Sequence, residues 1–263
     1  MASLPGPSPL ASLASLASAS RERLATIDLI ASDVDGTLTQ VGKLGTALLD
    51  ALDRLHARGV GLIPVSGRPA GEVLGLCRYL PHVEFGVAEN GLLEIVADQP
   101  PRWLGPSTDL ARLLAVGEHL NRDHHAQLRR TGDAFCRLGD VAYEREARDE
   151  RELLRLRELA EARGVFLIWS NVHVHLAERR PDKGAGLMLA LDRRGIDPRR
   201  VATVGDAPND AGLFVADRFG LTFGTADVLA QHEWFDALPE FVAAQREVAG
   251  FLELVEVLVA ARS

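Results

Sequence analysis

The sequence predicts an α/β fold, in which a parallel sheet with helices on both faces is interrupted by an α+β insertion. Short apolar runs alternate with helix-patterned segments from Thr26 to about residue 90, as in buried parallel strands and their crossover helices. The same alternation returns after Asp182. The residues between have a different pattern, so we expect a flexible tail at 1–22, a discontinuous core at 23–90 and 178–263, and an inserted cap at 91–177.

The elements of the core follow from the spacing of apolar residues. Leu48, Leu52 and Leu55 recur at helical spacing and Gly59 ends their segment, which predicts a helix at 45–59. We expect strands at 27–32, 60–66, 83–88, 201–205 and 219–224. We expect further helices at 70–80, 184–194, 251–261 and near 209–216.

The insertion combines helices with exposed strands. Helices are expected at 108–122 and 148–164, and Leu153, Leu156 and Ala160 share one inward face of the second. Four segments are expected to form strands: 127–131, 133–144, 165–169 and 170–178.

Residues 1–20 are rich in Ala, Ser, Leu and Pro, with no basic residue before Arg21. Ser and Pro interrupt the leucines, which disfavours a secretory signal. A transit peptide to an organelle stays open because the segment is Ser-rich and acid-poor, although it lacks arginine. We interpret the segment as a flexible tail.

Composition and charge limit the partners. The 263 residues are 47% hydrophobic and 25% charged, as in soluble folded proteins, and a net charge of −8 disfavours nonspecific binding to nucleic acid. No apolar run approaches the ~20 residues that cross a bilayer. Cys77 and Cys136 fit free thiols in a reducing compartment. We therefore expect a cytoplasmic protein that binds neither nucleic acid nor membranes.

Acidic side chains follow two of the predicted strands. Asp33-Val34-Asp35-Gly36-Thr37 comes after the first strand, and Gly205-Asp206 and Asn209-Asp210 follow a later one. Ligands of open α/β folds bind at the carboxyl ends of the strands, and Mg²⁺ prefers oxygen ligands. The first motif alone would also fit a turn with solvated acids.

Two further core segments offer groups for an anion. Ser66-Gly67-Arg68 precedes a helix, where a hydroxyl and backbone N–H groups can hold an anion, although a serine there can also be only a helix cap. Lys183 begins another helix and, with Lys43, is one of two lysines in a chain with 29 basic residues. A solvated surface charge is the alternative for Lys183.

At these residues the sequence resembles the haloacid dehalogenase superfamily of phosphohydrolases, whose four motifs are matched by Asp33–Thr37, Ser66, Lys183 and 205–210. The position of the insertion, together with Ala88-Glu89-Asn90-Gly91, is similar to the Cof-type subgroup (class IIB cap), which includes sucrose-phosphate and mannosyl-phosphoglycerate phosphatases. The resemblance implies a Rossmann-like core and a cap that selects the substrate. Gly224-Thr225-Ala226 departs from the Asn-Ala pair of many Cof-type members.

The resemblance also implies a mechanism. Asp33 would attack phosphorus to form an aspartyl-phosphate, and Asp35 would protonate the leaving alcohol and then deprotonate water. The implied cofactor is Mg²⁺, with Asp33, Asp35, Asp206 and Asp210 as its ligands, directly or through water. The groups implied to bind or orient the phosphoryl oxygens are Ser66, Gly67, Lys183 and Asn209.

Cap residues are candidates for substrate recognition. Alternation along a strand at 169–177 places Trp169, Asn171, His173 and His175 on one face, which we expect to close over the core, and aliphatic residues on the face toward the cap helices. A metal bound by the two histidines and a polar face without a role are alternatives. Arg68 and Asn90 are substrate candidates nearer the expected mouth of the site. Three cap arginines either bind a second anionic group or lie solvated: Arg129, Arg130 and Arg137.

The sequence thus predicts a Mg²⁺-dependent phosphatase of a small polar phosphate monoester, with a sugar or glycosyl phosphate as the leading substrate class. A phosphosugar mutase, a phospho-signalling module and a noncatalytic phospho-ligand binding protein are the alternatives. The pair of acids at one strand end and the long insertion favour the hydrolase over the signalling module. The substrate, the pathway and the oligomeric state stay open.

Overall fold

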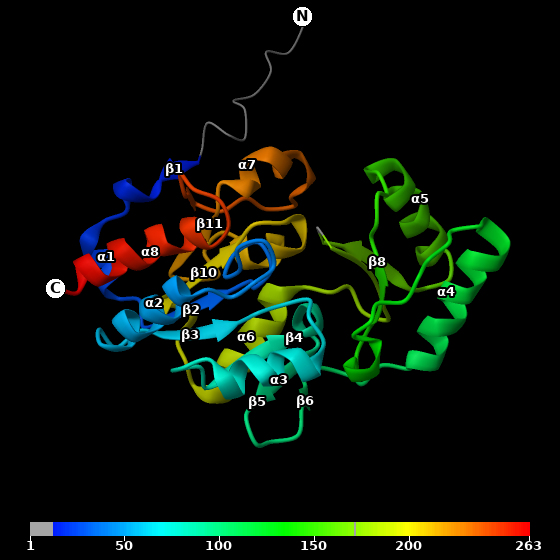
Figure 1. The fold of residues 1–263 in the computed structure, drawn as a ribbon, viewed down its shortest axis with the longest axis horizontal. Helices are drawn as coiled ribbons and strands as arrows, with labels where there is room; N and C mark the ends of the chain where they lie inside the picture. Colours follow the sequence, from blue (N-terminus) through cyan, green and yellow to red (C-terminus); the bar gives the residue numbers. More distant parts are fainter. Residues whose placement is uncertain (1–12, 171) are drawn as a thin grey trace, which may run out of the picture. The chain divides into compact units, whose positions relative to one another are not determined.

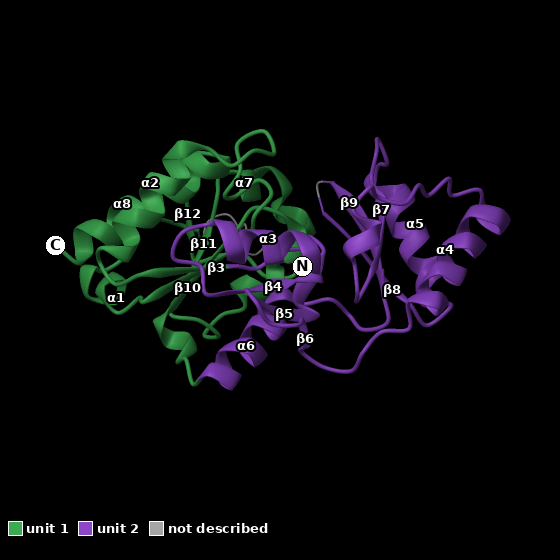
Figure 2. Ribbon diagram, turned by 60° about the horizontal axis from the view of Figure 1, so that its bottom comes forward, with its two compact units in different colours: residues 1–63, 195–263 green, residues 64–194 purple. Residues whose placement is uncertain are grey.

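The computed structural model describes residues 13–170 and 172–263 and divides into two units (Figure 2). The first unit comprises Met1–Ile63 and Gly195–Ser263, and the second comprises Pro64–Arg194. Residues 64–90 and 178–194 therefore group with the insertion. The expected division into core and cap stays a prediction.

A parallel sheet forms the centre of the first unit. Within the described residues its strand order is β1-β12-β11-β10-β2-β3. The strands are β1 (Ala14–Ser15), β12 (Phe241–Val242), β11 (Leu221–Gly224), β10 (Val201–Gly205), β2 (Leu29–Ser32) and β3 (Gly61–Pro64). In the register of the central strands, Thr203 of β10 lies opposite Ala31 of β2 and Thr222 of β11. The predicted parallel α/β sheet is confirmed.

Helices accompany this sheet in the first unit (Figure 1). They are α1 (Arg21–Ala25), α2 (Thr46–His56), α7 (Asp227–Gln231) and α8 (Glu247–Ala261). Helix α2 buries Leu48, Leu52 and Leu55, the residues whose spacing predicted it, and it packs against α8. In the described part of the chain, none of the helices has both the length and the apolar composition that crossing a bilayer requires.

Part of the expected tail is ordered secondary structure. Strand β1 pairs in parallel with β12, and Ser20 caps α1 by accepting a hydrogen bond from the N–H of Arg23 (3.2 Å). Leu16 and Leu24 are buried, so apolar side chains hold this segment against the unit. Residues 1–12, the remainder of the expected tail, lie outside the described residues.

The second unit begins with an α/β segment. It contains α3 (Ala70–Tyr79), β4 (Phe85–Ala88), β5 (Leu93–Val96), β6 (Arg102–Trp103) and α6 (Lys183–Arg194). Strand β4 was expected to continue the parallel sheet, but it pairs antiparallel with β5, and its parallel contact is the single bridge from Val65 to Val87. The hairpin of β4 and β5 was missed because Glu89-Asn90-Gly91 was considered only as a motif.

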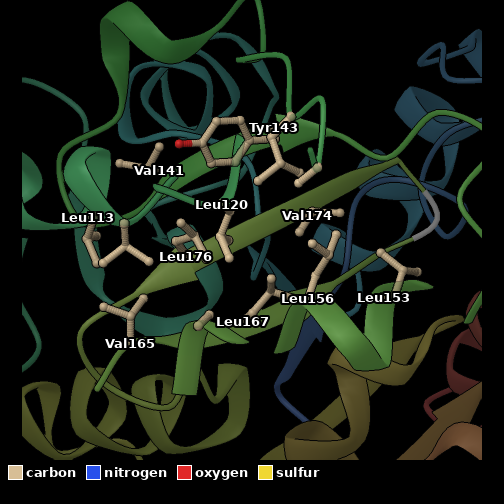
Figure 3. Packing of buried hydrophobic residues seen from close by; sticks show 14 residues of the cluster. Leu113, Leu120, Val141, Tyr143, Leu153, Leu156, Val165, Leu167, Val174 and Leu176 are labelled. Atoms are coloured by element: carbon tan, nitrogen blue, oxygen red, sulfur yellow. The ribbon is translucent and has the colours of Figure 1, made fainter. Parts of the chain in front are cut away.

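The rest of the second unit is a small α+β layer. Helices α4 (Leu110–His124) and α5 (Glu150–Glu161) accompany an antiparallel sheet in the order β7-β9-β8. Its strands are β7 (Val141–Glu144), β9 (His173–Ala177) and β8 (Phe166–Trp169). Leu153 and Leu156 of α5 pack with Val174 and Leu176 of β9 in one apolar cluster (Figure 3), as their spacing predicted.

Two of the strands expected in the insertion are absent or shorter than predicted. Residues 127–131 make only the isolated bridge from Arg130 to Tyr143. Ala134–Cys136 forms the 3₁₀ helix η4, and the strand begins only at Val141. Polar side chains at 131–140 are engaged in ion pairs and turns, which alternation of polarity does not reveal.

The two cysteines agree with the expectation from the sequence. Cys77 is buried in α3, Cys136 is half-buried, and both are free thiols. Burial raises the pKa of Cys77 to about 12. Cys77 is therefore an inert core residue rather than a nucleophile.

Candidate active site

Asp33 follows β2 directly and is buried. Its backbone N–H donates to the carbonyl of Val204 in β10 (2.9 Å), which continues the strand pairing by one residue. The chain then turns: Leu38 donates to the carbonyl of Val34 (2.9 Å), and the N–H of Gly36 donates to Oγ1 of Thr39 (3.1 Å). Asp35 lies half-buried in this turn. The turn is therefore an ordered loop in which Asp33 is held by the sheet.

Asp206 and Asp210 belong to the next loop, after β10. Asp210 is buried, and its Oδ2 accepts hydrogen bonds from the N–H groups of Asp206 (2.9 Å) and Ala207 (3.0 Å). A Cβ on Gly205 would lie 2.6 Å from the Asp210 carboxyl carbon, so the loop requires glycine there. The helix expected near 209–216 is the 3₁₀ helix η6 (Pro208–Phe214), which starts at this tightened turn.

Three buried carboxylates meet at this edge of the parallel sheet. Asp33, Asp206 and Asp210 each offer an oxygen, and the three atoms lie within 4.8 Å of one another. Oδ1 of Asp206 also accepts a hydrogen bond from Oγ1 of Thr37 (3.0 Å). Like charges this close in a buried site repel, and a set of oxygen donors suits a hard divalent cation. The donor set therefore fits Mg²⁺.

Ser66 and its neighbours form a second polar site, in the second unit. Ser66 is buried, and its N–H donates to the carbonyl of Val87 (2.9 Å). Its Oγ accepts from the N–H of Arg68 (3.1 Å), which leaves the hydroxyl proton available for donation. A Cβ on Gly67 would lie 3.0 Å from Oδ1 of Asn90, so the Asn90 side chain lies against this turn.

Lys183 begins α6 and is 1% exposed, so the solvated alternative is wrong. The start of α6 packs on the 3₁₀ helix η3 (Glu89–Gly91), where a Cβ on Gly91 would lie 2.3 Å from the carbonyl oxygen of Asp182. Residues 89, 90 and 91 have φ of +53°, +55° and +98°. Such strain in non-glycine residues clusters at functional sites. The second unit thus places Asn90 between the Ser66 turn and the Lys183 helix.

The remaining core candidates are partly exposed. Arg68 is half-buried, and its Nη1 lies 2.5 Å from Oε2 of Glu72, one helical turn along α3. Asn209 is half-buried in η6, next to Asp210. Gly67 is half-buried in the Ser66 turn. Their roles toward a phosphate stay predictions.

Glu89 is a buried acid that the sequence analysis missed as a candidate. Its carboxylate accepts from the N–H of Ala70 (2.9 Å) at the start of α3, and from the N–H groups of Leu138, Gly139 and Asp140 (2.5 to 3.2 Å). Burial and the nearby Asp140 carboxylate raise the pKa of Glu89 to about 7, against the opposite effect of these N–H groups. An acidic residue directly after a buried apolar strand was the signal available in the sequence.

The expected face of aromatic, Asn and His residues does not form as one strand. Oγ of Ser170 accepts from the N–H of His173 (3.1 Å), so a turn separates β8 from β9. Trp169 consequently lies opposite Val174 and packs against the apolar cluster, not with the histidines. Asn171 lies outside the described residues.

His175 is 1% exposed, so the expectation that it lies on an open face is wrong. Its Nδ1 lies 2.7 Å from Oδ2 of Asp140. His173 is half-buried, with Nε2 3.9 Å from Oε2 of Glu144. Within the described residues, the acidic cluster is the one group of three metal-ligating side chains, and neither histidine belongs to it.

The three cap arginines have different environments. Arg129 and Arg130 are exposed, and Nε of Arg129 lies 3.1 Å from Oε1 of Glu146. Arg137 is 4% exposed and is ion-paired with Asp133 and Asp140. Neither expectation for Arg137, as a solvated residue or as an open anion binder, agrees with this environment.

Comparison with known proteins finds relatives in sequence and in fold. No protein-family model matches the chain. Phosphoglycolate phosphatases of Methanospirillum hungatei and Methanopyrus kandleri are 26% and 29% identical to it over 75% and 73% of this chain and 84% and 82% of theirs.

Solved structures share the fold at lower identity. A Thermoplasma acidophilum protein has a TM-score of 0.71 at 19% identity, covering 88% of this chain and 99% of that one. A haloacid dehalogenase-like hydrolase from Bacteroides thetaiotaomicron has a TM-score of 0.66 at 17% identity, covering 88% and 98%. Sucrose-phosphatase from Synechocystis has 0.60 at 18% identity, covering 88% and 97%.

The chain shares its fold with haloacid dehalogenase-like hydrolases and is similar in sequence to phosphoglycolate phosphatases. Its additional antiparallel strands are consistent with a cap domain.

Proposed function

We propose that the chain is a Mg²⁺-dependent phosphatase that hydrolyses a small polar phosphate monoester through an aspartyl-phosphate. The observation that carries the proposal is the cluster of Asp33, Asp206 and Asp210 at the carboxyl ends of β2 and β10. Relatives that are phosphatases support the reaction class.

Asp33 is the proposed nucleophile. Its backbone is fixed by the N–H bond to Val204, so the carboxylate is presented without rearrangement of the strand end. In-line attack of a carboxylate oxygen on phosphorus forms the aspartyl-phosphate as the bond to the leaving alcohol breaks. Asp35, two residues along the same turn, is the proposed acid that protonates that alcohol and then the base that deprotonates water.

The residues that would hold Mg²⁺ are Asp33 and Asp206 with their carboxylates and Asp35 with its backbone carbonyl. Bound there, the cation supplies positive charge that offsets the repulsion between an anionic nucleophile and an anionic phosphate. Asp210 has Oδ2 committed to two backbone N–H groups, so its proposed role is to hold the Asp206 loop in place.

Ser66, Gly67, Lys183 and Asn209 are the proposed donors to the phosphoryl oxygens. Hydroxyl, N–H, ammonium and amide groups all match the charge that spreads over these oxygens in a loose transition state. Support comes from the burial of Ser66 and Lys183, because a buried lysine is retained only with anionic or polar partners.

Two substrate classes follow from different observations. The phosphoglycolate phosphatase relatives favour phosphoglycolate, a small ester with a second anionic group. The structural likeness to sucrose-phosphatase favours a sugar phosphate, in agreement with the sequence-based expectation. We place phosphoglycolate first, because these relatives share more sequence identity with the chain.

The test is release of inorganic phosphate from phosphoglycolate, sugar phosphates and glycosyl phosphoglycerates, with Mg²⁺ and with EDTA. Asp33→Asn is the test variant, and Asp50→Asn, which changes an exposed acid of α2, is its control. We expect turnover that needs Mg²⁺, is unchanged in the control and falls below ~1% in Asp33→Asn. Turnover in Asp33→Asn close to the wild-type rate would exclude the aspartyl-phosphate, and a folded wild type inactive on every ester would exclude the substrate class.

A further inference from the structure

The turn at Ser66, Gly67 and Arg68 has every carbonyl oxygen bound. Oxygen of residue 66 accepts from the N–H of Asn90, that of residue 67 from Nη1 of Arg137, and that of residue 68 from the N–H of Glu89, each at 3.0 Å. In a trans peptide the carbonyl and the following N–H point in opposite directions. Fixing the carbonyls of residues 66 and 67 therefore also fixes the direction of the N–H groups of Gly67 and Arg68, whereas Pro69, after the third carbonyl, has no N–H.

The bond to the middle carbonyl is the one made by a side chain. Arg137 reaches Gly67 from the loop before β7, and its guanidinium is held in place by two acids. Its Nη2 donates to Oδ2 of Asp133 (2.7 Å) and its Nη1 donates to Oδ1 of Asp140 (2.9 Å). Two carboxylates outweigh its single positive charge, so this buried arginine does not itself attract a substrate anion.

A second contact fixes the loop that carries Arg137. The Glu89 carboxylate binds the N–H groups of residues 138–140 and that of Ala70, the first residue of α3. A Cβ on Gly139 would lie 2.9 Å from Cδ1 of Leu92 and 3.1 Å from Oε2 of Glu89, so only glycine allows this close approach. The loop that carries Arg137 is therefore joined to the start of α3 at two points. Arg137 binds Gly67, before the helix, and Glu89 links the N–H groups of residues 138–140 to that of Ala70, the first residue of the helix.

We propose that Arg137 is a positioning residue for phosphate binding: it holds the carbonyl of Gly67, so that the N–H of Arg68 in the same peptide stays on Oγ of Ser66 and the Ser66 hydroxyl keeps its proton for the anion. The inference rests on the proposed function, in which Ser66 and Gly67 bind the phosphoryl group. Without Arg137 the Gly67 carbonyl loses its buried donor, and glycine places little restriction on rotation of the peptide. A rotated peptide takes the N–H of Arg68 away from Oγ of Ser66, so the hydroxyl that would donate to the anion is no longer oriented.

The chain contains a matched control for this role. Arg148 is also buried, is also paired with acids, and also donates to backbone carbonyls, those of Ala126, Gln127, Glu144 and Arg145. All of these partners belong to the insertion, so Arg148 supports the same layer without contacting the Ser66 turn. Comparing Arg137→Met with Arg148→Met therefore separates positioning from general stability.

The experiment measures the Kd of inorganic phosphate by calorimetry in the presence of Mg²⁺, together with KM, kcat and the Tm of each variant. We expect Arg137→Met to raise the Kd of phosphate and the KM about tenfold, which corresponds to the loss of one hydrogen bond to a charged donor. Arg148→Met is expected to lower the Tm about as much as Arg137→Met does. It should leave the Kd of phosphate and the KM within about twofold of the wild-type values. Arg137→Lys, which keeps the charge, is measured in the same way if Arg137→Met does not fold.

Equal effects of Arg137 and Arg148 substitutions on phosphate affinity would overturn the proposal, as would unchanged affinity in a folded Arg137 variant. A wild type that neither hydrolyses phosphate esters nor binds phosphate would overturn the proposed function and this inference together. If the wild type hydrolyses phosphate esters and binds phosphate, and the Arg137 variant binds phosphate equally well, then the role of Arg137 is overturned and the proposed function is not.

Discussion

A Cβ atom on Gly36 would lie 2.4 Å from Oδ2 of Asp206, so the loop after β2 and the loop after β10 approach each other without a side chain between them. Gly36 has a φ of +85°, which side chains rarely adopt, and the next residue, Thr37, donates to the other oxygen of Asp206. The position of one metal-ligand candidate thus depends on a glycine in the motif of the other.

Gly36→Ala is therefore expected to displace Asp206. A shift of about 1 Å in a catalytic group can cost ~100-fold in rate, so phosphate release should fall by that order. Gly42→Ala is the matched control, because Gly42 also has a positive φ, +71°, but no described atom lies within 4 Å of its added Cβ. Both variants should lose about 1–2 kcal/mol of stability through the positive φ, and only Gly36→Ala should lose activity. Equal rates of phosphate release in Gly36→Ala and Gly42→Ala would contradict the prediction that Gly36 fixes the position of Asp206.

The acidic cluster predicts that Mg²⁺ reverses the order in which the wild type and an Asp206 variant unfold on heating. Asp206→Asn removes one of three clustered negative charges but keeps an oxygen that can accept from Thr37. Without Mg²⁺ the variant should therefore have a higher Tm than the wild type, because the repulsion is smaller. With Mg²⁺ the order should reverse, since a cation at ~100 times its Kd stabilises the wild type by about 2.7 kcal/mol. Thermal unfolding with and without EDTA tests this, and parallel curves would argue against a metal at this cluster.

Much of the first unit could be predicted because each acidic motif directly follows an apolar strand in the sequence. The strand before Asp33 and the strand before Asp206 are apolar runs, and carboxyl ends of adjacent parallel strands meet at one edge. Joining these two facts places the two acids together without a structure. The 3₁₀ form of η6 could not be predicted in this way, because it depends on the Asp210 side chain capping its own turn.

The cap was predicted less well because its polar residues act across long sequence distances. His175 has the pattern of an exposed residue on an alternating strand, yet Asp140, 35 residues earlier, binds it in the interior. Nothing in the sequence distinguishes Arg137 from the other arginines. Only the fold brings it to Gly67, which lies 70 residues away in the sequence. Periodicity correctly predicted the apolar side of β9, where Val174 and Leu176 meet the helices.

The start of α6 offers a third prediction. A Cβ on Gly186 would lie 2.4 Å from Cα of Gly91, which is backbone and cannot rotate away. Gly186→Ala should therefore separate α6 from η3, lower the stability by ~1–3 kcal/mol and reduce activity by moving Lys183. Gly75→Ala in α3 is the control, because no described atom lies within 4 Å of its added Cβ, and it should raise stability by ~0.4–1 kcal/mol. Opposite shifts in urea unfolding are expected, and a Gly186→Ala that gains stability would contradict the packing at Gly91.

The raised pKa of Glu89 predicts how stability changes with pH. The carboxyl has a pKa of about 7 in the folded protein, above its ordinary value of 4.5, so between these values the folded state binds more protons than the unfolded state. The stability that Glu89 contributes is therefore complete below about pH 4.5 and is lost as the pH rises through 7.

Glu89→Gln cannot titrate, so the stability difference between wild type and variant isolates this contribution from groups that titrate in both. Urea unfolding at pH 5, 6, 7 and 8 should show that difference falling with pH by an amount on the order of 2–3 kcal/mol, since one pKa unit corresponds to about 1.4 kcal/mol. A difference that grows toward pH 8 would mean that the N–H groups of residues 70 and 138–140, together with Arg137 beside Asp140, hold Glu89 ionised. The same series run with Glu256→Gln, whose carboxyl pKa is held below its ordinary value of 4.5 by the hydrogen bond from Arg54, should give a difference that is nearly flat over this range.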